Sequence, residues 1–369
     1  MGDAMVNELR PLFEAAGPFL SLYLAAEGDV ENAAQRLELR WKSTRAGLQE
    51  REVPVGVLEA VDPLVEGGHT AGEALAVIVP VDGTAYGRGL AARPVREVLA
   101  RWGAVPYVLP LLAEAQVPFV AVLATRASAE IVARLPGGER SEHVEGEGGP
   151  HLHRSAPGGW SQPRHQHRAE VIWERNAGEV AEVLARTVDE VRPRFVAAAG
   201  DVRALQFLRD ESPKRVAELL RVVGGELPSM EEVLERAAGL VTDEVRGDAE
   251  ALRERFAQER GRGPCGLAAE GAEATLAALA RSQVEVLLVA DDPDDERTAW
   301  FGAAPQQVAI DRATVQDMGE SLPVEGRLVD VAVRAALGTS ADVHVADPGG
   351  AGPRGGLGAL LRFSDEVTS

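Results

Sequence analysis

The first third of the chain alternates between short apolar runs and stretches with helical spacing of apolar residues. Phe19–Leu24 is rich in β-formers and ends at Gly28-Asp29, which predicts a buried strand and a turn. Asp29 is the expected N-cap of a helix whose apolar positions are Val30, Ala33, Leu37, Trp41 and Leu48. Two more apolar runs, Ala74–Val81 and Val117–Ala124, predict further strands. This alternation indicates a sheet covered by helices.

Apolar periodicity is lost between Pro136 and Arg168, where Gly, His, Pro, Ser, Glu and Arg predominate. We therefore expect a long exposed loop or linker there. Helical spacing then returns and ends before Pro193; its positions are Ile172, Asn176, Val180, Leu184, Val188 and Val191. Phe195–Ala199 follows as a short predicted strand.

A second long helix is expected to begin at Ser229, where Ser229-x-x-Glu232 forms a capping box. Its apolar face consists of Val233, Leu234, Ala237, Val241, Val245, Leu252 and Phe256. The glycine-rich segment 261–266 breaks the chain again. The last hundred residues predict another α/β unit, with strands at Val284–Ala290, Thr298–Gly302 and Ala341–Val345 and a helix around Val329–Leu337.

The simplest division is into three domains. Residues 1–140 form an N-terminal α/β domain, 141–167 an exposed Gly/His/Arg loop and linker, 168–262 a central α/β domain and 268–369 a C-terminal α/β domain. The glycine-rich run 347–358 lacks the lysine of a P-loop, so we expect a β-turn between the last two strands. No nucleotide cofactor is predicted.

Composition limits the classes of function. A formal charge of −20 excludes broad attraction to DNA or other nucleic acid, so any RNA contact has to be concentrated in a patch. The sequence has no run of eighteen apolar residues and no export signal at its start, which predicts a cytoplasmic protein without membrane contact. A single cysteine, Cys265, excludes a disulfide framework and a thiolate zinc site.

The one basic patch along the sequence lies at 151–168. It contains three arginines, no acidic residue and four of the seven histidines. Trp160 offers a flat face for a base, and Gly158-Gly159 permits close backbone approach. The predicted RNA-binding residues are Arg154, Gly158, Gly159, Trp160, Arg164, His165, His167 and Arg168. The alternative interpretation of this segment is a solvated linker.

The string Gly-Gly-Trp-Ser-Gln at 158–162, followed by a basic run and a long helix, resembles the Gly-Gly-Gln loop of the archaeo-eukaryotic release factors as modified in their bacterial relatives. Segments 291–295, 298–302 and 355–363 resemble the third domain of the same superfamily. The resemblance covers residues 150–369 in the family's domain order. It implies an α/β fold with three release-factor/Pelota-like domains, each a mixed sheet with packed helices.

The first 140 residues contain no codon-reading motif that we can identify, so stop-codon-specific termination is not expected. The resemblance is closer to Balon-type ribosome hibernation factors and to Pelota. It implies a factor in the ribosomal A site that contacts tRNA and 23S-type rRNA near the peptidyl-transferase centre. A translational GTPase is the implied protein partner, because relatives commonly work with one.

In a release factor the catalytic glutamine follows the two glycines directly. Here Trp160 takes that place and Gln162 comes two residues later, a shift of roughly 6 Å along an extended chain. We therefore favour a loop that docks without hydrolysis, in a hibernation factor that silences or protects idle ribosomes under stress. One alternative is a peptidyl-tRNA hydrolase in ribosome rescue that uses Ser161 and Gln162. Another is a protein–protein adaptor that makes no RNA contact.

Two further patterns suggest metals. The pairs His151-x-His153 and His165-x-His167 would each point to one side of a strand, as zinc ligands do, but no cysteine or carboxylate supports the set. The acidic run Asp291–Glu296 lacks the ligand spacing of a calcium loop, and a solvated turn is expected. No metal site is predicted.

Overall fold

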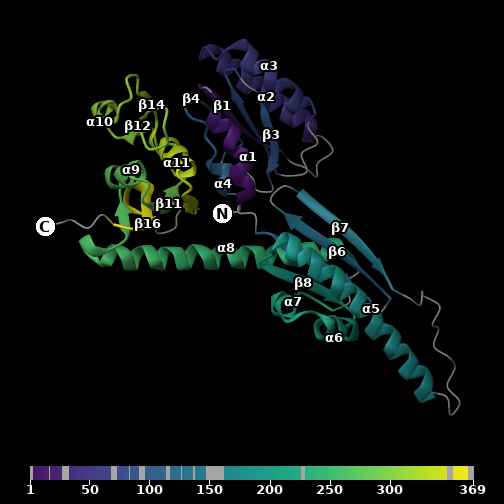
Figure 1. Cartoon of the computed structure of the whole chain (residues 1–369). Helices are drawn as coiled ribbons and strands as arrows, with labels where there is room; N and C mark the ends of the chain where they lie inside the picture. The colour runs from purple at the N-terminus through teal and green to yellow at the C-terminus, as the bar shows by residue number, and fades with distance from the viewer. Residues whose placement is uncertain are drawn as a thin grey trace. The chain divides into compact units, whose positions relative to one another are not determined.

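The computed structural model describes residues 3–15, 17–26, 33–67, 73–82, 84–90, 96–113, 117–125, 127–135, 138–146, 162–225, 229–346 and 352–364. The chain forms two compact units (Figure 1). One, the composite unit, is built from both ends of the chain, Met1–Ala115 and Ala249–Ser369. The other, the central unit, is Gln116–Asp248.

The N-terminal lobe of the composite unit contains a four-stranded sheet of order β3-β2-β1-β4, antiparallel throughout. Its elements are α1 (Asp3–Glu14), β1 (Phe19–Ala25), α2 (Ala33–Glu50), α3 (Val55–Glu66), β2 (Ala74–Pro80), β3 (Tyr86–Leu90), β4 (Val98–Gly103) and α4 (Leu109–Ala113). Every residue of β1 and β2 is buried, so the two predicted strands are confirmed. The expected N-cap Asp29 lies outside the described residues.

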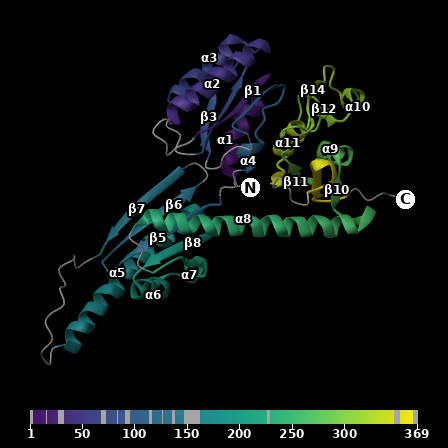
Figure 2. The ribbon, with the colours of Figure 1, turned by 180° about the vertical axis from the view of Figure 1, so that it is seen from behind.

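Period-2 alternation divides β1 between two layers. Leu20, Leu22 and Leu24 pack with α2 and α3, which lie together on one face of the sheet (Figure 2). Phe19 and Tyr23 point to the opposite face and join a cluster with α1 and α4. The strand is therefore buried on both sides, and its single polar residue, Ser21, accepts a hydrogen bond from the amide of Tyr107.

The C-terminal lobe contains a mixed sheet of order β10-β16-β11-β15 and a small antiparallel sheet of order β13-β12-β14. Its elements are η1 (Gly263–Cys265), β10 (Ala268–Glu270), α9 (Ala272–Ala280), β11 (Val284–Ala290), β12 (Thr298–Phe301), β13 (Val308–Ala309), α10 (Arg312–Asp317), β14 (Val324–Arg327), α11 (Leu328–Gly338), β15 (Asp342–Ala346), η2 (Arg354–Gly356) and β16 (Leu357–Leu361). Because β11 lies between β15 and β16, the expected β-turn between these last two strands is wrong.

The two lobes share one hydrophobic core. Side chains from the N-terminal lobe, such as Tyr107 and Leu111, belong to the same buried cluster as Val329 and Val343 of the C-terminal lobe. The sequence treats the two ends of the chain as separate domains. Periodicity shows which face of an element is apolar, but it does not show that a segment more than two hundred residues away covers that face.

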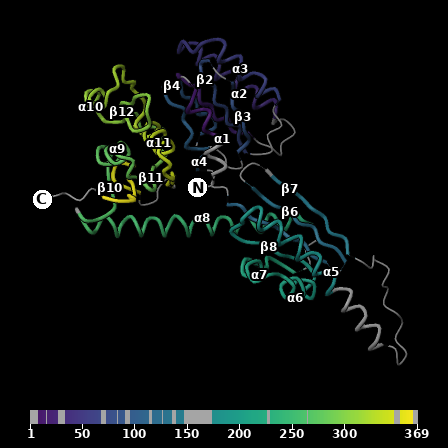
Figure 3. The backbone as a smooth tube through the Cα atoms, in the orientation of Figure 1, coloured from purple at the N-terminus to yellow at the C-terminus, as the bar shows by residue number. Residues whose placement is uncertain are grey.

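The central unit is a five-stranded mixed sheet of order β7-β6-β5-β8-β9, in which β5, β8 and β9 are parallel. Its elements are β5 (Phe119–Ala124), β6 (Ser128–Leu135), β7 (Gly138–Glu145), α5 (Gln162–Val191), β8 (Phe195–Gly200), α6 (Val202–Glu211), α7 (Lys214–Leu219), β9 (Leu220–Val222) and the first half of α8 (Met230–Gly261). Helices α5, α6 and α7 cover one face, and α8 covers the other. Figure 3 traces α8 as one continuous helix.

This unit begins earlier in the sequence than the expected boundary near residue 140, because β5 pairs in parallel with β8 across 76 positions, Phe119 opposite Phe195. The expected loop is also shorter, since β7 occupies Gly138–Glu145 and α5 starts at Gln162. The sequence of β7, GERSEHVE, is mostly polar because β7 is an edge strand whose backbone pairs with β6 alone. Such a strand has no apolar alternation to detect.

The predicted mixed α/β fold is confirmed by these sheets and helices. Among the residues that the structure describes, no helix combines the length and apolar character needed to cross a bilayer.

Candidate functional site

The segment that contains the Gly-Gly-Trp-Ser-Gln string joins β7 to α5, and the structure fixes its starting point. The amide of Gly146 donates to the carbonyl of Ala127 at 2.8 Å. A Cβ on Gly146 would lie 2.3 Å from Cγ of Asn176, a buried residue of α5. A side chain at position 146 would have to displace the amide of Asn176, so the end of β7 packs directly against α5.

Half of the predicted RNA-binding residues fall outside the part of the chain that the structure describes, namely Arg154, Gly158, Gly159 and Trp160. The same holds for Ser161, the catalytic candidate of the hydrolase alternative, and for His151 and His153. The structure therefore tests neither their contacts nor their proposed roles.

The remaining candidates, Gln162, Arg164, His165, His167 and Arg168, have backbones in the first turns of α5. Positions 164 and 168 are about one helical turn apart and share a side of the helix. Positions 165 and 167 are roughly 200° apart around the axis, so the zinc hypothesis, which needs a strand at this pair, is wrong for it. Across the described ranges, no group of His, Cys, Asp and Glu side chains is arranged to hold a metal ion.

The turn after β8 is held by close backbone packing at Gly200 and by a helix cap at Asp201. Gly200 has a φ of 140°, and a Cβ there would lie 1.8 Å from the carbonyl oxygen of Ala124. Asp201 then caps α6, because its Oδ1 accepts hydrogen bonds from the amides of Arg203 at 3.0 Å and Ala204 at 3.2 Å. The small cavity between the β5–β6 turn, α5 and α6 has a volume of only about 10 Å³, too little for a ligand.

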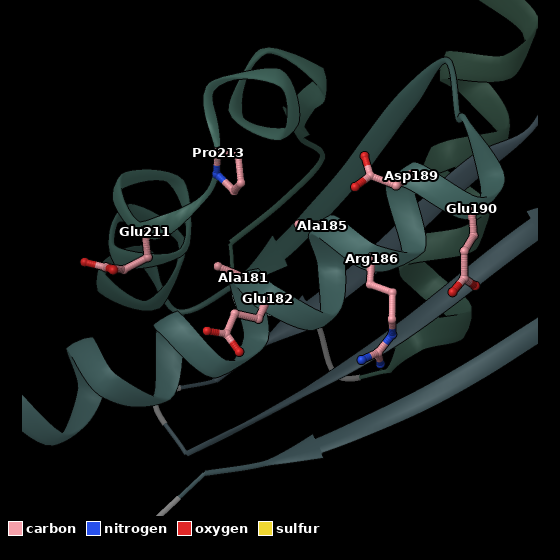
Figure 4. Close-up of a pocket in the computed structure, with 8 residues that line it drawn as sticks. All are labelled: Ala181, Glu182, Ala185, Arg186, Asp189, Glu190, Glu211 and Pro213. Atoms are coloured by element: carbon pink, nitrogen blue, oxygen red, sulfur yellow. The ribbon is translucent and has the colours of Figure 1, made fainter.

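A larger groove of about 560 Å³ lies between α5 and the α6–α7 pair (Figure 4). Small apolar residues, Ala181, Ala185 and Pro213, contribute to its lining, and most of its charged side chains are acidic. The carboxylate of Asp189 receives two hydrogen bonds from Arg215. These hydrogen bonds keep the pKa of Asp189 below its ordinary value, because they outweigh the opposing effect of desolvation. An acidic groove of this kind repels RNA phosphate. We therefore expect RNA contact of the central unit at the start of α5 and in the loop before it.

The acidic run at 291–296 is a turn with exposed side chains at Asp294 and Glu296, as expected, but its first residue, Asp291, is partly buried. The hydroxyl of Tyr107 donates to the carboxylate of Asp291, and the ring of Tyr107 lies under the guanidinium of Arg327, 5.1 Å from its carbon. Arg327 also pairs with Asp330 at 3.2 Å, where both side chains are less than a tenth exposed. We call these four residues the inner anchor.

Burial dominates the electrostatics of the inner anchor. It raises the pKa of Asp330 to about 7, although Arg327 and Arg101 oppose the shift, and it also raises the pKa of Asp291. Sequence reasoning missed these residues. One indication was available: Asp330 interrupts the otherwise apolar stretch Leu328–Val333, where an acidic residue needs a nearby cation such as Arg327.

Comparisons with known proteins agree with this picture of the central unit. Residues 118–262 match the family model described as "Bacterial archaeo-eukaryotic release factor family 2". The matched range begins at β5 and ends with α8, so it includes the central sheet and both of its helical layers.

Over its whole length the chain is similar to the uncharacterized protein Rv2629 of Mycobacterium tuberculosis, with 28% identity over 367 residues, 97% of this chain and 96% of the relative. Among solved structures it is similar to the archaeal translation termination factor aRF1, with 16% identity, coverage of 98% and 97%, and a TM-score of 0.27. It is also similar to archaeal Pelota in a ribosome-bound model with ABCE1, with 14% identity, coverage of 97% and 94%, and a TM-score of 0.40.

The two structural likenesses have TM-scores too low to carry weight, so the assignment rests on the family model. That model matches the unit in which the Gly-Gly-Trp-Ser-Gln string joins β7 to α5. Residues 118–262 therefore form a region that matches the bacterial archaeo-eukaryotic release factor family 2.

Proposed function

We propose that this protein is a translation factor that binds the ribosomal A site and acts as a hibernation factor of the Balon type. The observation that supports the proposal most is the position of the Gly-Gly-Trp-Ser-Gln string, in a connection between β7 and α5 of a release-factor-family unit. The connection leaves β7 at a point where Gly146 is packed under Asn176. A connection that begins at such a closely packed strand end is suited to carry a contact with a large RNA assembly.

Charge distribution supports contact through this loop. The chain has a formal charge of −20, and the groove beside α5 is acidic. Positive charge without acidic neighbours is concentrated at 151–168. The proposed contacts of this segment are 23S-type rRNA near the peptidyl-transferase centre and tRNA, and the proposed protein partner is a translational GTPase. Such a role implies work in the cytoplasm.

The proposal favours silencing over hydrolysis. Ordering a water at the peptidyl-tRNA ester needs a side chain placed within a fraction of an ångström, and Trp160 stands where the family's glutamine follows the glycines. Gln162 is the first residue of α5, so its backbone belongs to the helix. We infer that the loop docks by stacking and phosphate contacts and leaves the ester intact.

Co-sedimentation with ribosomes tests the proposal. We expect the purified chain to pellet with vacant ribosomes and to compete with a factor or tRNA for the A site. Absence from the pellet of both vacant and translating ribosomes would overturn the proposal and would favour the adaptor alternative. Release of nascent peptide would favour the hydrolase alternative.

A further inference from the structure

We propose that Arg51, Arg96 and Arg101 form a second site for the phosphates of single-stranded RNA, and that the carboxylates of Asp294 and Glu296 occupy this site until RNA displaces them. The inference deepens the proposed function and rests on it for the choice of RNA as the polyanion.

The arginines line a pocket of about 340 Å³ within the composite unit. Arg51 follows α2, Arg96 precedes β4, and Arg101 lies on β4. The acidic residues come from the run at 291–296 of the other lobe. In this pocket three cations therefore face two carboxylates.

The pairs between these groups have the chemistry of an arginine–phosphate contact. Nη2 of Arg96 lies 2.7 Å and 2.6 Å from the two carboxylate oxygens of Asp294. Nη1 of Arg101 lies 3.7 Å from Oε1 of Glu296. A guanidinium binds carboxylate and phosphate oxygens through the same donors, so an RNA phosphate can replace Asp294 on Arg96, while Nη2 of Arg101 keeps its hydrogen bond to the carbonyl of Pro293.

The acids are also easy to displace, because they are open to solvent. The side chain of Asp294 is 73% exposed and that of Glu296 is 82% exposed. Ion pairs at such exposure contribute little stability and are screened by salt. They reduce the local positive charge without closing the pocket.

Displacement does not require the lobes to separate, since the inner anchor holds the acidic run from beneath. Nε of Arg327 donates to the carbonyl of Asp295 at 3.0 Å, and Nη2 donates to that of Asp292 at 2.5 Å. Tyr107 binds Asp291 at the start of the run. These contacts do not involve Arg96, so the outer pair can open while the loop keeps its shape.

Arg51 retains its capacity to bind an anion. It is exposed and makes no ion pair with any residue in the described part of the chain. Trp102 lines the same pocket and is only partly buried, which gives a base an aromatic face to stack on. An aromatic side chain beside several arginines favours single-stranded RNA over an isolated anion.

Fluorescence anisotropy with a labelled single-stranded RNA, measured on the full chain at low salt, tests the proposal. Removing the competing acids by Asp294→Asn with Glu296→Gln should raise RNA affinity by roughly tenfold, as expected when two negative charges beside a phosphate are removed. Arg51→Ala should lower affinity and flatten the salt dependence, because the variant lacks one guanidinium that binds phosphate. Glu231→Gln with Glu235→Gln, on the exposed face of α8, removes the same charge elsewhere and should change affinity little.

Other results are expected if the ion pairs of Arg96 and Arg101 only hold the two lobes together and the pocket binds no RNA. In that case the Asp294 and Glu296 substitutions lower the melting temperature and leave RNA affinity unchanged, and Arg51→Ala has no effect on either. That outcome, or absence of RNA binding by every variant, would overturn the inference. Failure of the proposed function is distinguishable, since it appears as loss of ribosome co-sedimentation while the acid-to-amide variant still gains affinity for free RNA.

Discussion

The hydroxyl of Tyr107 lies 2.7 Å and 2.6 Å from the two carboxylate oxygens of Asp291, a residue 184 positions later in the sequence. The backbone of Tyr107 is held equally well: its amide donates to Oγ of Ser21 at 3.0 Å, and its carbonyl accepts from the hydroxyl of Tyr23 at 2.6 Å. Tyr107 thus connects the N-terminal sheet to the acidic run of the other lobe.

Tyr107→Phe should destabilise the composite unit by about 1–3 kcal/mol, because the partly buried carboxylate of Asp291 loses a hydrogen bond. Chemical denaturation followed by fluorescence measures the change. Tyr86→Phe is the matched control, since the hydroxyl of Tyr86 donates to Glu8 at the surface, and it should have a smaller effect. Equal losses for the two variants would contradict a special role for Tyr107.

Because of Asp330, the free energy of unfolding should fall as pH rises. Its pKa is raised to about 7 in the folded chain, mainly by burial, whereas an unfolded aspartate has a pKa of about 3.9. The folded state therefore binds more protons than the unfolded state between these values. The contribution of the protonated form is complete below about pH 4 and is lost as pH passes through about 7. Asp330→Asn should remove this component, by up to about 1.4 kcal/mol for each pH unit.

The measurement is the free energy of unfolding of both proteins at a series of pH values from 4 to 8. The difference between wild type and Asp330→Asn isolates this residue from Asp291, whose pKa is also raised. A difference that does not vary with pH would contradict the prediction.

Arg164→Ala with Arg168→Ala should weaken ribosome binding and flatten its salt dependence. Removing one arginine–phosphate interaction should reduce the slope of log affinity against log salt by about 0.7 to 0.9. Co-sedimentation at several salt concentrations gives the slope. Arg246→Ala with Arg253→Ala removes two arginines from the α8 surface and serves as the control. Unchanged affinity and slope in the first variant would exclude the start of α5 as the RNA-binding surface.

Trp160→Ala and Gln162→Ala separate silencing from hydrolysis. If the loop docks by stacking, Trp160→Ala should weaken binding by about 1–3 kcal/mol, Gln162→Ala should change it little, and peptidyl-tRNA should stay intact with every variant. If the protein is a hydrolase, the wild type should release peptide and Gln162→Ala should lose that activity while it still binds. Ester cleavage on programmed ribosomes is the measurement. Release that depends on Gln162 would overturn hibernation and leave the family assignment unchanged.

Apolar runs in the sequence predicted several strands correctly. They identified β1, β5, β8 and β11, although Ser21 interrupts the first run and Glu285 the last. The internal strand β6 was not predicted. The helical spacing from Ile172 to Val191 likewise lies within α5. The edge strand β7 was missed, because a strand with one neighbour and an exposed surface needs no apolar alternation.

The electrostatic contacts were missed for a different reason. Asp291 is partly buried, accepts a hydrogen bond from Tyr107 and lies near Arg327, and neither residue is close to it in sequence. An acidic run after a strand has the same sequence pattern whether its side chains are solvated or pair with arginines. The basic segment at 151–168 was visible because its residues are contiguous, whereas Arg51, Arg96 and Arg101 meet only after folding.

The shared core of the composite unit has a consequence for the order of synthesis. The N-terminal sheet leaves the ribosome first, but the face that contains Tyr23 and Ile78 belongs to a cluster completed by Leu328 and Val331. That face stays incompletely covered until the last hundred residues have been made. The central unit has its five strands, helices α5, α6 and α7 and the first half of α8 between residues 116 and 248, and we expect it to fold in the meantime. A nascent chain paused at about residue 250 would therefore carry one finished unit and one apolar surface, which is the kind of surface that chaperones bind.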